Sequence, residues 1–112
     1  MNLLNKRKLL KLEKKNQGNK KLSEAIKKLI EDIEKAEWKN PLEIKEDRPD
    51  ADNVHSEGLY FFNISIHRTM ILIVFDESEA SIVWTGNHQE YDKTFKGNKN
   101  TIEKWLKNHN LI

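Results

Sequence analysis

The apolar residues between positions 22 and 36 recur at the three- and four-residue spacing of an amphipathic helix, and this pattern constrains the fold most. The positions are Leu22, Ala25, Ile26, Leu29, Ile30, Ile33 and Ala36. Such spacing, kept over about four turns, predicts a helix that packs one face on a core. A second helix is expected from Lys6 to about Lys15, with Asn5 as its N-cap. Residues 1–40 are therefore interpreted as mainly helical, although residues 1–5 fit either an edge strand or a helix start.

Three short apolar runs in the second half of the chain predict strands. The first run, residues 59–66, alternates in polarity along its length. Its apolar face consists of Tyr60, Phe62, Ile64 and Ile66. The second run, residues 70–75, is apolar on both faces, which is typical of a central strand covered on two sides. The third, residues 80–85, places Ile82 and Trp84 on one face.

The order of these segments predicts a single α+β domain over residues 1–112. The strands, joined by tight links, form an antiparallel meander over residues 59–85. An acidic connection is expected over residues 47–58 and a C-terminal helix over residues 98–109. We therefore expect N-terminal helices packed on one face of a small, mostly antiparallel sheet of three to four strands, with one helix after it.

Composition excludes several classes of protein. The chain has no cysteine, which rules out disulfides, thiolate metal sites and cysteine nucleophiles. Its longest apolar run, residues 70–75, is far too short to cross a membrane, and no signal peptide is recognisable, so we expect a cytoplasmic protein without a membrane partner. Residues 1–30 carry ten Lys or Arg against two Asp or Glu. This basic third either binds an anionic partner or solvates helix surfaces.

Residues 86–93 gather the side chains with the most chemical potential. They include His88, Glu90, Tyr91, Asp92 and Lys93 within a few positions of the third predicted strand. RNA is cut without a metal when a base, an acid and cations surround a phosphate that its neighbouring 2′-hydroxyl attacks. The segment has the residue types for this reaction, but composition alone favours a polar loop in which Tyr91 packs on the sheet and His88 caps a backbone group. The four histidines have no metal-ligand spacing, so we expect no metal and no cofactor.

Several short stretches resemble the HigB-type toxins of bacterial type II toxin–antitoxin systems, within the RelE-like superfamily. The matching stretches are Ala36-Glu37-Trp38-Lys39-Asn40-Pro41, Ile44-Lys45, Pro49, Ala51-Asp52, Phe62-Asn63-Ile64, Gly86, His88 and Glu90-Tyr91-Asp92-Lys93. They occur in the family's order over roughly residues 22–93. The resemblance implies a RelE-like fold and an mRNA endonuclease (mRNA interferase) that acts on translating ribosomes, inhibits translation and is silenced by a cognate HigA-type helix-turn-helix antitoxin.

Two arginines of the family are absent, since their positions hold Met70 and Val83. Arg68 lies two residues before Met70 and on a continuous strand shares its face, about 7 Å along. We therefore expect Arg68 to replace the missing cation and neutralise transition-state charge. His88 is the candidate for proton transfer, and Tyr91 would orient the phosphate or act as an acid.

The remaining site predictions concern RNA binding. Lys93, Lys96, Lys39 and Lys45 are expected to contact the RNA backbone. Trp38 and Trp84 could stack on bases, although their apolar patterns favour the core.

Two other readings remain open because the family arginines are missing. One is a toxin that binds a protein target, as gyrase-directed relatives on the same fold do. The other is a degenerate toxin retained for antitoxin binding.

Overall fold

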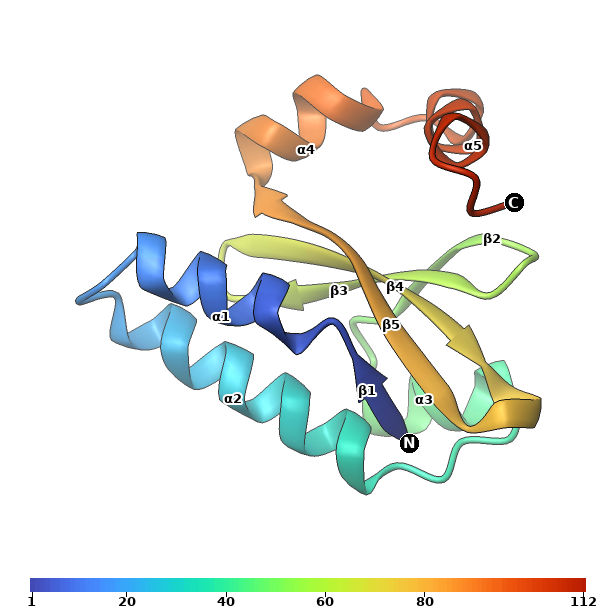
Figure 1. Cartoon of the computed structure of the whole chain (residues 1–112), viewed down its shortest axis with the longest axis horizontal. Helices are drawn as coiled ribbons and strands as arrows, with labels where there is room; N and C mark the ends of the chain where they lie inside the picture. Colours follow the sequence, from blue (N-terminus) through green and yellow to red (C-terminus); the bar gives the residue numbers. More distant parts are fainter.

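A five-stranded sheet in the order β1-β5-β4-β3-β2 forms the centre of the computed structural model, which describes residues 1–112 (Figure 1). The strands are β1 (Asn2–Leu4), β2 (Asp52–His55), β3 (Leu59–Ile64), β4 (His67–Val74) and β5 (Glu79–Asn87). The helices are α1 (Lys6–Lys15), α2 (Lys20–Lys35), α3 (Pro41–Asp47), α4 (His88–Phe95) and α5 (Lys99–Asn108). The prediction of an α+β domain with N-terminal helices, a mostly antiparallel sheet and a C-terminal helix is confirmed.

The sheet has two more strands than the predicted meander, one at each edge. Strands β2 to β5 are antiparallel in sequence order, whereas β1 pairs in parallel with β5. Strand β1 settles the open interpretation of residues 1–5 in favour of an edge strand. Strand β2 was not predicted, because its residues are mostly polar, none of them is buried, and no apolar face alternates along it.

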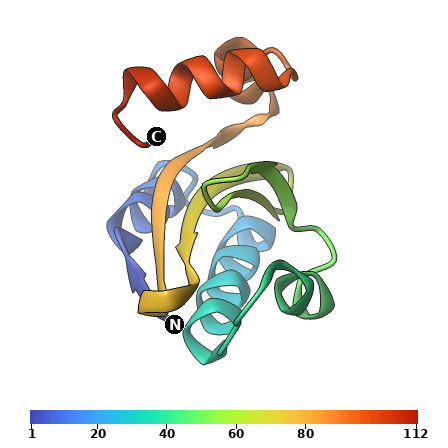
Figure 2. The same ribbon diagram turned by 90° about the vertical axis from the view of Figure 1, so that its right-hand side faces the viewer.

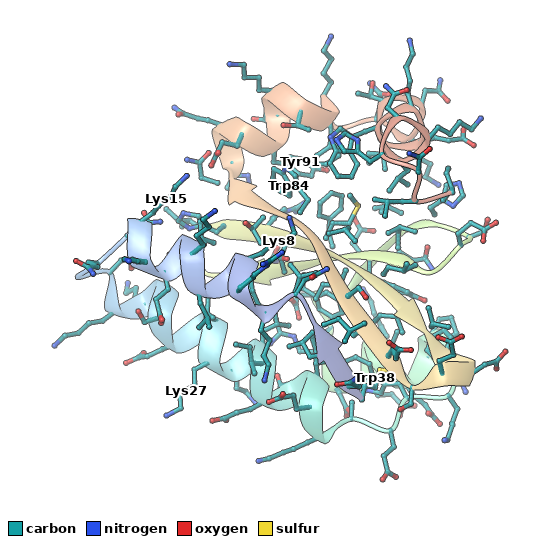
Figure 3. The ribbon with its side chains drawn as sticks, in the orientation of Figure 1. Lys8, Lys15, Lys27, Trp38, Trp84 and Tyr91 are labelled. Carbon is teal, nitrogen blue, oxygen red and sulfur yellow. The ribbon has the colours of Figure 1, made fainter.

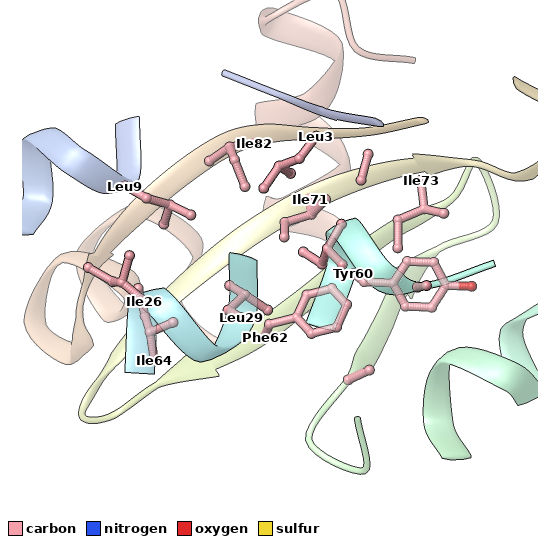
Figure 4. Packing of buried hydrophobic residues seen from close by; sticks show 14 of the residues in the cluster. Leu3, Leu9, Ile26, Leu29, Tyr60, Phe62, Ile64, Ile71, Ile73 and Ile82 are labelled. Carbon is pink, nitrogen blue, oxygen red and sulfur yellow. The ribbon is translucent and has the colours of Figure 1, made fainter. Parts of the chain in front are cut away.

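Helices α1 and α2 cover one face of the sheet, where the larger core lies (Figure 4). Four residues of α2 that follow the helical period are buried: Leu22, Ile26, Leu29 and Ile33. Asn19 begins this helix, because its side chain accepts a hydrogen bond from the Leu22 amide at 3.1 Å. Asn5 is the N-cap of α1 by position, as predicted, but it has a left-handed φ of 64° and its Nδ2 donates to the Ile82 carbonyl, so its side chain makes no capping hydrogen bond.

Helices α4 and α5 cover the opposite face and enclose a second, smaller core (Figure 2). Its buried residues are Leu59, Phe61, Met70, Phe95, Ile102 and Leu106. The N-terminal helices lie on one face as expected, whereas the C-terminal part forms two helices, not one, on the other face. Both faces are covered because β3 is apolar on each of them, with Phe62 in the first core and Phe61 in the second.

A β-bulge in β5 divides the strand between the two cores. Met70 pairs with Trp84 and Ile71 with Ile82, so one residue of β5, Val83, has no partner on β4. The alternation shifts at this point. Ile82 therefore packs in the first core and Trp84 against the second, which corrects their expected common face.

The connection from α3 to β3 is fixed by an ion-pair network around Arg48. Its guanidinium contacts Asp32 of α2 at 3.1 Å and Asp50 at 2.9 Å, and donates to the Asn63 carbonyl. Partial burial raises the pKa of Asp32, but the hydrogen bonds from Lys28 and Arg48 outweigh it and leave this pKa below its ordinary value. The acidic connection is thus held by its neighbours.

Strand β3 ends earlier than predicted. Ser65 follows it with a left-handed φ of 62°, and Ile66, placed on the apolar face by the sequence, is exposed in the turn to β4. No helix is long and apolar enough to cross a membrane.

Candidate active site

Residues 88–95 form helix α4 where a polar loop was the favoured interpretation. A reciprocal capping box begins the helix: the Asn87 side chain accepts from the Glu90 amide at 2.8 Å, and Glu90 Oε1 accepts from the Asn87 amide at 3.0 Å. An Asn followed three positions later by Glu is a sequence signature that could have located this helix. The cap comes from Asn87, not from His88, and it fixes where Tyr91 lies.

Arg68 and Tyr91 lie in direct contact. The Arg68 Cζ is 4.7 Å from the centroid of the Tyr91 ring and 6.0 Å from that of Phe61, both in the range of cation–π attraction. Arg68 makes no ion pair with any carboxylate, and its buried Nε has no hydrogen-bond partner. The guanidinium is therefore held by two aromatic rings while its charge remains unneutralised.

Trp84 lies next to Tyr91 and packs against the two rings that Arg68 contacts (Figure 3). Its ring centroid lies 6.4 Å from that of Tyr91 and 6.2 Å from that of Phe61. The indole folds back over Gly86, where an added Cβ would meet the ring at 2.7 Å. Glycine at this position thus allows Trp84 and α4 to approach each other. Trp84 is half-buried, so part of its ring is accessible to a ligand.

His88 is the first residue of α4 and is exposed. It is three positions before Tyr91, so the two side chains are neighbours on the helix surface. No hydrogen bond joins His88 to Arg68 or Tyr91. The structure therefore brings Arg68 and Tyr91 together and leaves His88 beside them, with its ring free.

The two positions where the family has arginine lie in the second core. Met70 is fully buried, and Val83 packs partly buried against the same cluster beneath α5. Arg68 lies on the same face as Met70, two residues earlier in β4, where Tyr91 of α4 packs against it. A cation at position 70 or 83 would be surrounded by apolar side chains, whereas Arg68 is half-buried and reaches the surface.

The four lysines expected to bind RNA fall into two separate groups. Lys93 lies in α4 and Lys96 directly after it, and both are exposed. Lys39 and Lys45 lie before and in α3, at the opposite end of the molecule (Figures 1 and 2). Lys45 also donates to the Ala51 carbonyl at 2.7 Å. The lysines of α3 therefore do not share a surface with Arg68.

Trp38 belongs to the first core. It is 3% exposed, stacks on Phe62 at 6.5 Å and donates from its indole nitrogen to Asp47. Its ring is not available to a base.

His67 is a buried titratable residue next to the candidate site. It is adjacent to Arg68 in β4 and points to the opposite face, where it pairs with Asn87 across the sheet. Burial lowers its pKa, the nearby charge of His88 lowers it further, and Glu90 partly offsets both effects. No group of three or more His, Asp or Glu side chains is placed to share a metal ion.

One family model matches the chain over residues 22–94, which is more than half of its length. The family is described as HigB toxin, the RelE-like toxic component of a toxin–antitoxin system. The matched segment includes Arg68, His88 and Tyr91, whereas β1, α1 and α5 lie outside it. No curated protein matches the chain.

Proposed function

Because the chain belongs to the HigB family of RelE-like toxins from toxin–antitoxin systems, we propose that it is a metal-independent mRNA endonuclease that acts on translating ribosomes and inhibits translation. Its N-terminal helices, mostly antiparallel sheet and C-terminal helices agree with a RelE-like fold. Cleavage of mRNA on ribosomes would be a cytoplasmic activity.

The observation that carries the proposal is the unneutralised guanidinium of Arg68 against the Tyr91 ring. A partly desolvated cation without an anionic partner is costly, and a phosphate of RNA supplies the missing charge with two acceptor oxygens for the planar guanidinium. Trp84 is half-buried next to Tyr91, and the exposed His88 precedes Tyr91 by three positions on α4. We expect Arg68, Tyr91 and His88 to surround one ribose–phosphate linkage.

The residues suggest the following division of roles. The 2′-hydroxyl oxygen attacks the adjacent phosphorus, so that a 2′-O–P bond forms and the P–O5′ bond breaks. A base removes the 2′-hydroxyl proton and an acid protonates the departing 5′ oxygen, which leaves a 2′,3′-cyclic phosphate and a free 5′-hydroxyl. His88 is the candidate for proton transfer, Tyr91 orients the phosphate or acts as the acid, and Arg68 stabilises the developing charge.

The test is cleavage of mRNA on purified ribosomes by the wild type and by Arg68→Ala, His88→Ala and Tyr91→Phe. Loss of a group that stabilises transition-state charge costs about a hundred- to a thousandfold in rate, so we expect a loss of this size for Arg68→Ala. Lys104→Ala is the matched control, because Lys104 is an exposed cation of α5 without an ion pair and is expected to be dispensable. A folded Arg68→Ala variant that cleaves at the wild-type rate would overturn the proposed role.

A toxin of this family implies a cognate antitoxin. We propose a HigA-type helix-turn-helix protein as that partner, with mRNA and the ribosome as the other partners. Lys93 and Lys96 are exposed in and directly after α4, the helix that carries Tyr91, and are expected to contact the RNA backbone. Lys39 and Lys45 would contact RNA only at a second surface.

The buried apolar residues at positions 70 and 83 favour a second candidate function, a toxin that binds a protein target such as gyrase without cutting RNA, or a degenerate toxin kept for antitoxin binding. Induction of the protein in bacteria separates these readings. New mRNA ends that disappear in Arg68→Ala support cleavage, growth arrest with intact mRNA and damaged DNA supports a gyrase-directed toxin, and normal growth with folded protein supports a degenerate one.

A further inference from the structure

We propose that a polar pocket on the other side of the sheet from Arg68 binds an RNA base that carries an exocyclic amino group, namely adenine, cytosine or guanine. We call it the His67 pocket. It encloses about 380 Å³, and its polar lining consists of Lys15, Asn16, His67, Thr85, Asn87 and Glu90. The assignment of the base to RNA rests on the proposed function. The fit of a base to the pocket rests on the geometry of its lining residues.

Three elements build the pocket. His67 pairs with Asn87 where β4 and β5 meet, and Thr85 lies two residues earlier on β5 and on the same face. The last turn of α1 supplies Lys15, which extends toward the side where α4 begins (Figure 3). The first turn of α4 supplies Glu90. The pocket walls are therefore formed by the ends of β4 and β5, the last turn of α1 and the first turn of α4, and not by a loop.

His67 is the feature that points to a ligand. The residue is 6% exposed, its Nδ1 is buried without a partner, and neither ring nitrogen forms a hydrogen bond within the chain. Buried polar groups are almost always satisfied, so an unpartnered imidazole lining a pocket calls for a partner from outside. Since burial lowers its pKa, the ring is neutral near pH 7 and presents one donor and one acceptor.

The surrounding side chains also keep unused hydrogen-bonding atoms. Glu90 engages Oε1 with the Asn87 amide, which leaves its Oε2 free. The Asn87 carbonyl oxygen accepts from Glu90, which leaves its amide nitrogen free as a donor. Asn16 donates to Leu12 and keeps its oxygen as an acceptor. A ligand with both donors and acceptors along one edge matches this arrangement, and a nucleobase has such an edge.

The charge of the pocket favours a base over a phosphate. One ammonium (Lys15) and one carboxylate (Glu90) line it, so its net charge is close to zero and the carboxylate repels an anion. A carboxylate readily accepts hydrogen bonds from the amino group of a base. Adenine, cytosine and guanine have this group and uracil has none.

The position of the pocket fits a nucleotide next to the cleaved linkage. Arg68 and His67 are consecutive in β4 and point to opposite faces, and His88, which directly follows β5, is close enough to His67 to affect its pKa. An RNA strand that passes this end of the sheet can therefore place a phosphate at Arg68 and an adjoining base in the His67 pocket. The base would fix the register of the strand relative to the reacting phosphate.

The test measures nucleoside binding to the full chain by NMR, with the backbone amide signals of Thr85 and Asn87 as reporters. Nucleosides carry no phosphate, so their binding is independent of Arg68 and of cleavage. We expect adenosine, cytidine and guanosine to shift these signals in a saturable way, and uridine and inorganic phosphate to leave them unchanged. Glu90→Gln and His67→Phe should each weaken binding about tenfold or more, because each removes a hydrogen bond to the base.

Glu103→Gln, on α5 and away from the pocket, is the matched control and should bind as the wild type does. Thr85→Val removes one hydroxyl without changing shape, and should weaken binding even if His67→Phe fails to fold. Equal binding of uridine, a response to inorganic phosphate instead of nucleosides, or no response at all would overturn the proposal. Nucleoside binding without any mRNA cleavage would instead contradict the proposed function while leaving this pocket assigned.

Discussion

Two half-buried arginines in this protein have opposite surroundings. Arg48 lies 5.8 Å above the Phe62 ring and pairs with two carboxylates and a carbonyl. Arg68 lies over two rings but has no anionic partner. An arginine side chain thus joins three segments by ion pairs and a hydrogen bond at position 48, whereas at position 68 its charge is not neutralised. We interpret Arg48 as a residue that maintains the fold. We interpret Arg68 as a residue whose positive charge is available to an anionic ligand.

Replacement of each arginine by methionine should separate these roles. Arg48→Met leaves the carboxylates of Asp32 and Asp50 without their cation in a partly buried site, so we expect a loss of about 3–5 kcal/mol in the free energy of unfolding. Arg68→Met removes only the contacts with the rings and should cost less than about 1 kcal/mol. Urea denaturation of both variants measures this difference, and equal losses would show that the contrast between the two sites is wrong.

At the scale of elements, the position of Tyr91 depends on the capping box of α4. Asn87→Ala removes the side-chain acceptor for the Glu90 amide and should cost about 1 kcal/mol, with faster amide exchange confined to residues 88–95 and a lower cleavage rate. Asn98→Ala is the matched control, since it removes the equivalent cap of α5 at 2.8 Å from the Thr101 amide but lies outside the proposed site. If Asn98→Ala lowered cleavage as much as Asn87→Ala, the cap of α4 would have no special role.

The elements that the sequence predicted best are those with a long apolar period. Helices α1 and α2 begin and end close to where the spacing indicated, and α5 covers Lys99–Asn108 where a helix was predicted over residues 98–109. The three features that were not predicted have physical reasons. Strand β2 is a polar edge strand, α4 is too short to display a period, and the bulge at Val83 breaks the alternation of β5.

The candidate site was predictable in part. The shared face of Arg68 and Met70 followed from strand alternation, and the structure confirms it. The His67 pocket was not predictable, because its walls come from α1, β4, β5 and α4, which are distant in the sequence. The packing of these helix ends against the end of the sheet is a tertiary arrangement, so no local sequence pattern predicts it.

At the scale of the whole molecule, His67 links stability to pH. Its pKa is below the ordinary value of 6.5, so the unfolded chain binds more protons and stability falls as pH drops below about 6.5. The titratable groups around this ring are Glu90, which raises its pKa, His88, which lowers it further, and Lys15, which lines the same pocket. Asp32, whose pKa is below its ordinary value of 3.8, loses its stabilising effect only in more acidic solution.

Urea denaturation at about pH 7.5 and about pH 5 checks this expectation, because the histidine window lies between these values. The wild type should lose stability over the interval, and His67→Phe should lose less. His109→Gln, a variant of an exposed histidine, should behave as the wild type does. An unchanged pH dependence in His67→Phe would show that another group is responsible.

The parallel pairing of β1 with β5 sets a condition on synthesis. Asn5, just after β1, bonds to Ile82 across a separation of 77 positions, and Leu3 lies beside Ala80 in the same ladder. A nascent chain therefore cannot complete its sheet until most of the message has been read. A fragment that ends before β5 can neither close this ladder nor form the contact between Arg68 and Tyr91, because Tyr91 follows β5 in the chain.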